Sequence, residues 1–430
     1  MKSHSRLRYH ARLIIPLLAA GWFAGAGLSV AREGPLAGLP GAPGPHIEKL
    51  KALADGAWLN LGAPAPDPKW GKARGRSWAC RMPFAPELRG AFLTGEGVHG
   101  YVKPDGHVMD DLWFYDLQQH RWICCYPGSD VAKLQLKVNA AGFEANERGE
   151  PVPLSILAHA YENITYDSDL HRLMIMPCPN HDYLVKSLKQ RREQWRKGQT
   201  INDSMASPWF FESDTGKWNR RATAMKHPAS GFGDALIYLP GRKRSYFRHL
   251  EDVWFYDTAA NTWTEVKPTG PALPFGIDAT SCFDSKRDRI CLGGGSYPVA
   301  PAGTNAFRFF DLKTNEWIDP QPKGAPCKGS NSYATNNAAM EYDSASDVVI
   351  VFRFGDDEDS RRCIFLYDPA ANSWSESAQG LPAEWGQCTN AFYDPVLNLH
   401  FFHVAGDSDD NGVIWAWRHR TAQKRPDKTE

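Results

Sequence analysis

Short apolar runs recur along this chain, and each ends in an aromatic residue followed by a polar turn. In five places Trp stands seven positions after such an aromatic residue: Tyr115/Trp122, Phe211/Trp218, Tyr256/Trp263, Phe310/Trp317 and Tyr367/Trp374. Asp follows the aromatic residue in four copies, and Asn or Gly stands two positions before Trp in four, with His120 in the fifth. The pattern predicts two antiparallel strands joined by a tight turn, which Asp caps and a left-handed residue closes.

A second pattern precedes the first and consists of an aromatic-Asp pair, a polar turn and an apolar run. Its copies are Tyr166-Asp167, Phe283-Asp284, Tyr342-Asp343 and Tyr393-Asp394. Taken together, the two patterns predict four antiparallel strands per unit, in the order a, b, c, d. From Trp218 onwards, the tryptophans recur at intervals close to roughly 50 residues, which is a period typical of kelch propellers.

These units resemble kelch repeats over nearly all of residues 56–420. The resemblance rests on a glycine turn after strand b, an aromatic-Asp end to strand c and a Trp in strand d. Only Gly293-Gly294 provides the family's glycine pair, whereas single glycines stand elsewhere, as at Gly95, Gly355 and Gly406. The resemblance implies an all-β fold, a kelch-type β-propeller similar to the central domain of galactose oxidase.

The units predict six blades. Five begin near residues 76, 155, 228, 275 and 331, and in the first of them strand a is expected around Trp78 to Phe84. The C-terminal segment supplies only three strands, from Cys388 to Trp417. The run Trp58 to Pro64 resembles a d strand, so we expect it to close the sixth blade and remove the open sheet edges. The alternative is a seventh blade between Trp122 and Trp218.

The first 31 residues are typical of an export signal, with a basic start, an apolar stretch and Ser29-Val30-Ala31 as a cleavage site. The alternative is an uncleaved membrane anchor. We therefore expect a signal peptide (1–31), an N-terminal linker (32–55), the propeller (56–420) and a polar C-terminal tail (421–430). The expected location is secreted or periplasmic, with no membrane span after cleavage.

The charge balance bears on the expected binding partners, and the cysteine count bears on disulfide pairing. Lys plus Arg and Asp plus Glu both number 49, so no net field favours nucleic acid. The nine cysteines are an odd number, which leaves at least one without a partner in the chain. Cys282 and Cys291 flank an expected hairpin turn and could face each other across two strands. The oligomeric state is not determined by the sequence.

In such blades the b–c and d–a loops emerge on one side, here called the loop face, and the short a–b and c–d turns emerge on the other, the turn face. Two insertions, residues 126–154 and 177–206, lie on the expected loop face, where binding residues tend to concentrate. Within the second, Tyr183 to Lys197 is typical of a basic helix. It is either a solvated helix packed through Leu184, Leu188 and Trp195, or a lid or anion site.

The candidate ligand-binding residues are polar or aromatic positions expected near the channel mouth on the loop face. They are Trp78, Arg81, Glu96, His159, Tyr297, Asn331, Arg353, Asn390 and His403. Carboxylate-dense loops could hold calcium through Asp356, Asp407 and Asp409, although such runs are also ordinary polar turns. No other cofactor is expected. His400 and His403 are three apart on one strand, so their side chains should point to opposite faces.

The function expected from these features is an exported binding module that recognises a glycan or a protein through the loop face. The alternative is a carbohydrate-active enzyme, mutarotase-like or oxidase-like, that uses a central pocket on that face. Related oxidases hold copper with two Tyr and two His, one from a trailing domain without a counterpart here, so copper is not expected. A purely architectural surface protein is a third possibility. Gly-x-Ser-x-Gly and phosphate-loop motifs are absent from the sequence.

Overall fold

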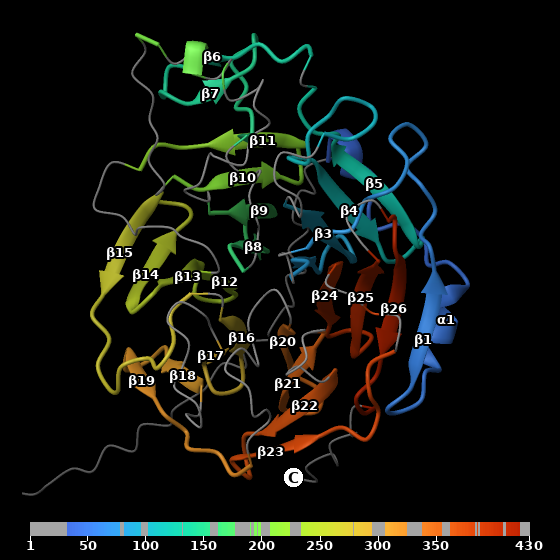
Figure 1. Ribbon diagram of the computed structural model, residues 1–430, viewed down its shortest axis with the longest axis vertical. Coiled ribbons are helices and arrows are strands. Elements are labelled where there is room, and N and C mark those ends of the chain that lie inside the picture. Colours follow the sequence, from blue (N-terminus) through green and yellow to red (C-terminus); the bar gives the residue numbers. More distant parts are fainter. Residues whose placement is uncertain are drawn as a thin grey trace, which may run out of the picture. The chain divides into compact units, whose positions relative to one another are not determined.

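The computed structural model describes residues 32–77, 81–95, 102–130, 132–154, 162–176, 190, 193–195, 197–198, 207–223, 234–277, 279–294, 306–324, 338–354, 362–382, 385, 388–406 and 410–421. In this part of the chain, six four-stranded antiparallel sheets are arranged as a β-propeller (Figure 1). The predicted all-β fold and the predicted number of blades are confirmed.

Every blade runs from an inner strand a to an outer strand d. Blade 1 consists of β2 (Phe84–Ala85), β3 (Gly90–Thr94), β4 (Leu112–Asp116) and β5 (Arg121–Tyr126). Blade 2 consists of β8 (Ile164–Asp167), β9 (Arg172–Ile175), β10 (Trp209–Glu212) and β11 (Lys217–Arg220). Blade 3 consists of β12 (Ala235–Leu239), β13 (Arg244–His249), β14 (Asp252–Asp257) and β15 (Thr262–Val266).

The last three blades follow the same order. Blade 4 consists of β16 (Thr280–Asp284), β17 (Arg289–Gly293), β18 (Phe307–Asp311) and β19 (Glu316–Ile318). Blade 5 consists of β20 (Ala338–Asp343), β21 (Val348–Arg353), β22 (Cys363–Asp368) and β23 (Ser373–Glu376). Blade 6 consists of β24 (Cys388–Asp394), β25 (Leu399–Ala405), β26 (Val413–Trp417) and β1 (Trp58–Gly62).

Blade 6 is completed by the N-terminal strand β1, which lies beside β26 (Figure 1). Trp58 pairs directly with Trp417, and their ring centroids are 5.7 Å apart. Trp385 meets the Trp58 ring edge-on at 4.9 Å, and the indole Nε1 of Trp58 donates to Gly380 O at 3.1 Å. The predicted closure of the ring by both ends of the propeller sequence is therefore confirmed.

The c–d turns have the predicted construction. The carboxylate of Asp368 accepts from the backbone N–H of Ala370 at 2.8 Å, and Asp257 and Asp311 cap their turns in the same way. Asn372 has φ of +46°, in the left-handed region that this turn requires. His120, which departs from the sequence pattern, adopts φ of +51° as well.

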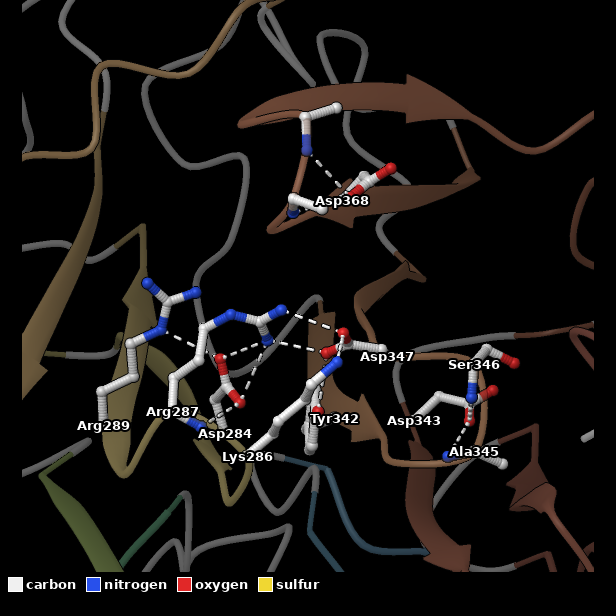
Figure 2. Close-up of polar contacts among 12 residues, drawn as sticks. Asp284, Lys286, Arg287, Arg289, Tyr342, Asp343, Ala345, Ser346, Asp347 and Asp368 are labelled. Atoms are coloured by element: carbon white, nitrogen blue, oxygen red, sulfur yellow. Dashed lines mark hydrogen bonds and ion pairs between the residues drawn. The ribbon is translucent and has the colours of Figure 1, made fainter. Parts of the chain in front are cut away.

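The turn face carries polar contacts between every pair of neighbouring blades. Figure 2 shows the contact between blades 4 and 5, where Arg287 donates to both carboxylate oxygens of Asp347 at 2.7 and 2.9 Å. The remaining contacts are Tyr166–Glu87, Tyr238–Asp169, Arg242–Asp288, Tyr393–Asp343 and Arg89–Asp394. Because each contact joins residues in or next to the a–b turns of adjacent blades, the series fixes the blades relative to one another around the channel.

Three parts of the fold differ from the sequence-based expectation. Strand a of blade 1 was expected around Trp78 to Phe84, but it covers only Phe84–Ala85. The reason is that the preceding backbone pairs with the neighbouring blade instead, as Met82 N–H donates to Ala391 O at 2.8 Å. The segment 32–55 was expected to be a linker, yet it forms helix α1 (His46–Lys51) and buries Leu36, Ile47 and Leu50.

The third difference is a hairpin within the first insertion, β6 (Lys137–Val138) with β7 (Glu144–Ala145). Of the expected basic helix, Gln190 and residues 193–195 are described and helical. Trp195 packs against the cluster of Leu136, Val152 and Leu154, as the packed-helix alternative required, whereas Leu184 and Leu188 lie outside the described residues. None of the described helices is long and apolar enough to cross a membrane.

Candidate functional site

The inner strands enclose a cavity of about 270 Å³ in the central channel. Each blade contributes one aromatic side chain to its wall, always the penultimate residue of strand a. These residues, here called the aromatic collar, are Phe84, Tyr166, Tyr238, Phe283, Tyr342 and Tyr393. Because strand a ends at the a–b turn, the collar surrounds the channel close to the turn face.

The tyrosines of the collar are held by acceptors at the a–b turns. The hydroxyl of Tyr342 donates to Asp347 at 2.9 Å, and that of Tyr393 donates to Asn398 at 2.9 Å. Tyr238 donates to Asp169. Burial, followed by the hydrogen bond to Asp169, raises the pKa of Tyr238, so its hydroxyl stays protonated. With the hydroxyls engaged in this way, the aromatic rings are the part of these residues that borders the cavity.

The inner end of the cavity is a polar group of three side chains, here called the channel floor: Arg81, Glu162 and Ser281. The Arg81 guanidinium pairs with the Glu162 carboxylate and donates to Leu236 O at 3.0 Å and Ser281 O at 2.5 Å. The Ser281 hydroxyl in turn donates to Glu162 at 2.7 Å. Arg81 thus joins blade 1 to blades 2, 3 and 4 across the channel.

Burial determines the electrostatics of this floor. The Glu162 side chain is only 2% exposed, and burial raises the pKa of its carboxyl, although Arg81 and Ser281 oppose the rise. The Arg81 side chain keeps 19% of its surface exposed. The arrangement therefore presents one partly accessible cation beneath the aromatic collar, with its charge balanced by a buried carboxylate.

A second carboxylate of the cavity wall, Glu341, has its charge balanced by the buried His400. The imidazole of the buried His400 donates from Nδ1 to Glu341, and its Nε2 lies 3.7 Å from Asp343. Burial disfavours the imidazolium, but the hydrogen bonds to Asp343 and Glu341 outweigh it and raise the pKa of His400 to about 9. At neutral pH, His400 is therefore a cation that balances the charge of this wall.

Only part of the predicted ligand-binding set can be placed. Trp78, Glu96, His159, Tyr297 and Asn331 lie outside the described residues. Of the other four candidates, Arg81 lines the cavity, whereas the described Arg353, Asn390 and His403 are buried within the blades, at 4%, 0% and 0% exposure.

Asn390 and His403 connect blade 6 to blade 1. They are directly opposed on β24 and β25, and Asn390 Nδ2 donates to Arg76 O at 3.2 Å. His403 Nε2 donates to Asn411 O at 3.0 Å, and its ring meets Trp122 edge-on at 5.2 Å. Burial lowers the pKa of His403 to about 4, so its ring is neutral at physiological pH. His400 faces blade 5 instead, which confirms that the two histidines point to opposite faces.

The proposed calcium ligands Asp356, Asp407 and Asp409 lie outside the described residues. Asp410, next to them, accepts from Gly406 N–H at 2.9 Å and Gly412 N–H at 3.1 Å, as a turn-capping carboxylate does. Within the ranges that the structure describes, no group of three or more His, Cys, Asp or Glu side chains is arranged to hold a metal ion.

A second cavity, of about 650 Å³, lies where the first insertion meets the c–d turn of blade 2, and Ser129, Asp130 and Trp218 are among its lining residues. Ser129 is held by the buried Asp110. The Asp110 carboxylate accepts hydrogen bonds from the Ser129 N–H at 2.7 Å and from the Ser129 hydroxyl at 2.5 Å. Burial raises the pKa of Asp110 to about 7, although both hydrogen bonds oppose the rise. This carboxyl therefore titrates near neutral pH.

We expect Asp110→Asn to stabilise the protein at pH 8 by roughly 1–3 kcal/mol. In the unfolded chain Asp110 ionises near its ordinary pKa of 3.8, so between about pH 4 and pH 7 the folded state binds the extra proton. Stability contributed by this group is consequently lost as pH rises through that interval. The advantage of the variant should shrink towards pH 4, as measured by urea unfolding at several pH values. The exposed Asp105→Asn serves as the control, and equal effects of both variants would contradict the assignment.

The aromatic collar was not expected as a site, although its signal was present. The aromatic-Asp pairs of blades 2, 4, 5 and 6 indicated turns, and the structure places their aromatic residues together around the channel. Fold and site together define a six-bladed β-propeller with an aromatic-walled pocket in its central channel. No family model and no curated protein matches this chain.

Proposed function

We propose that this protein is an exported kelch-type propeller that binds a glycan, and that the central cavity receives one sugar unit. The observation that carries the proposal is the aromatic collar above the polar channel floor. Aromatic rings offer flat apolar surface to the faces of a sugar, and a few polar groups fix its orientation. The small volume, about 270 Å³, suits a single sugar unit rather than a folded segment of a protein.

Kelch-type identity and export are parts of the same proposal. The first is supported by the glycine pair Gly293-Gly294 at the end of β17, the aromatic-Asp ends of strands c and the Trp in strands d. The basic and apolar character of residues 1–31 supports the second. The loop face remains the predicted surface for a larger glycan or a protein ligand. Many of its candidate residues lie outside the described ranges.

Replacing Phe283 by Ala should weaken glycan binding by at least about tenfold, which corresponds to 1.4 kcal/mol. Phe283 is half-buried and is one of the two collar residues without a hydroxyl anchor, so its removal subtracts stacking surface and leaves the polar contacts between blades intact. The measurement is calorimetric titration of the full chain with mono- and oligosaccharides chosen from a glycan array. Trp70→Ala, a half-buried aromatic outside the cavity, is the matched control.

Two outcomes would overturn the proposal. One is that the folded full chain binds no glycan, either on the array or in the titrations. The other is glycan binding that Phe283→Ala weakens no more than Trp70→Ala does, which would place the ligand elsewhere, with the loop face as the next surface to test.

A second candidate function is a carbohydrate-active enzyme in the same cavity. The observation in its favour is Glu162, a carboxyl of the channel floor whose pKa is raised by burial, which is the direction that favours a general acid. Turnover of free sugars by the full chain, abolished in Glu162→Gln while the sugar still binds, would favour the enzyme. Binding without turnover would favour the binding module.

A further inference from the structure

Two cysteines of blade 4 face each other. Cys282 on β16 and Cys291 on β17 are direct partners in the antiparallel register. Both are buried, at 7% and 0% exposure, and both belong to the apolar cluster between blades 4 and 5. Directly opposed residues of antiparallel strands have Cα atoms about 4.5 or 5.5 Å apart, and both values lie within the range that a disulfide spans.

The side chains are oriented towards each other as well. After burial, the neighbouring Cys291 thiol is the next cause that raises the pKa of Cys282, as expected for two thiols that lie close together across the strand pair. The other described cysteines are Cys124, Cys125, Cys363 and Cys388. Their described strand partners are residues other than cysteine: Trp113 for Cys124, Arg353 for Cys363 and Ala405 for Cys388.

We propose that Cys282 and Cys291 form a cross-strand disulfide in the wall of the central cavity. The reaction is thiol–disulfide exchange: the thiolate of one cysteine attacks a small-molecule disulfide and releases one thiol, and the second cysteine then resolves the mixed disulfide and releases the other. Two protons leave the cysteine thiols, and the oxidant is reduced to two thiols. The bond joins two strands that are already paired and therefore needs no rearrangement of the blade.

The environment indicates when the bond forms. Burial raises the pKa of Cys282 well above its ordinary value, so in the folded protein the reactive thiolate is scarce and the oxidant has little access. The two thiols are therefore expected to be oxidised while the chain is still folding, when both are accessible. Protein that folds under reducing conditions should retain both thiols and oxidise slowly afterwards.

Tryptic mapping tests the bond directly, because trypsin cuts between the two cysteines, after Lys286, Arg287 and Arg289. The full chain is refolded with oxidised and reduced glutathione, alkylated, digested and analysed by mass spectrometry. We expect peptides 249–286 and 290–308, each with one cysteine, to appear as a linked pair that is lighter by two hydrogens than their sum. The linked pair should be absent after digestion of the reduced protein.

Matched variants make the outcome decisive. Cys282→Ser and Cys291→Ser should each abolish the linked pair, and Cys124→Ser should leave it unchanged. The oxidised wild type should also unfold at a higher urea concentration than the reduced wild type, a shift that Cys282→Ser loses. The proposal is overturned if both peptides are recovered fully alkylated after oxidative refolding, or if either cysteine is linked to another position. None of these readouts depends on glycan binding.

Discussion

Trp58→Ala is expected to lower the free energy of unfolding by about 3 kcal/mol, within the range for large-to-small changes at packed aromatic positions. Trp58 opens β1, the strand that completes blade 6, and its ring contacts Trp385, Trp415 and Trp417. The substitution leaves a cavity at the place where the two ends of the ring meet. Urea unfolding followed by tryptophan fluorescence and by circular dichroism measures the change.

The control for this variant lies on the same strand. Asn60 is exposed and accepts from Gly62 N–H at 2.7 Å, an interaction that serine can also make. Asn60→Ser should therefore change stability by less than about 0.5 kcal/mol. If Trp58→Ala proved no more damaging than Asn60→Ser, the closing strand would contribute little to the fold.

Arg81→Ala should be at least as damaging, with an expected loss of roughly 3–5 kcal/mol. The substitution leaves the Glu162 carboxylate buried without its cation and removes the hydrogen bonds to Leu236 O and Ser281 O. An unpaired buried carboxylate takes up a proton, so the destabilisation should be smaller at pH 5 than at pH 8. Thermal and urea unfolding at both pH values provide the measurement.

The double variant Arg81→Ala/Glu162→Gln separates charge from packing. Because it removes the unpaired charge, it should recover more than half of the stability that Arg81→Ala loses. The destabilisation of the double variant relative to the wild type should also no longer be larger at pH 8 than at pH 5. A double variant as unstable as Arg81→Ala would mean that Arg81 acts through packing and backbone hydrogen bonds. Its ion pair with Glu162 would then contribute little.

The blades were predictable because their signals are local. Asp368, Asn372 and Trp374 lie within one turn and its flanking strands, and the same short pattern occurs in five blades. Blade 3 shows the limit of this approach, since its inner strand ends at Leu239, is followed by Pro240 and lacks the aromatic-Asp pair. Its c and d strands were sufficient to identify it. The short strand a of blade 1 was misplaced because the backbone before it bonds to a strand remote in sequence: Met82 N–H donates to Ala391 O of β24.

The site was less predictable because it depends on contacts between distant residues. Arg81, Glu162 and Ser281 meet across the channel, and no local pattern connects them. Asn390 and His403 were expected at the channel mouth from their place near strand ends. In a propeller, however, both faces of a blade pack against neighbouring blades, so polar residues of a strand can be fully buried.

The central claim is that residues from both ends of the propeller sequence share one sheet, and an engineered cross-link tests it most directly. Leu59 and Ala416 are direct partners and pack into the same apolar cluster. The variant Leu59→Cys/Ala416→Cys should form a disulfide that links tryptic peptides 52–69 and 363–418, whereas Leu59→Cys/Trp415→Cys, shifted by one residue to the opposite face, should not. Linkage of residue 59 to 416 is the predicted result. Failure to link, in a folded protein, would contradict the closed ring and with it the central cavity.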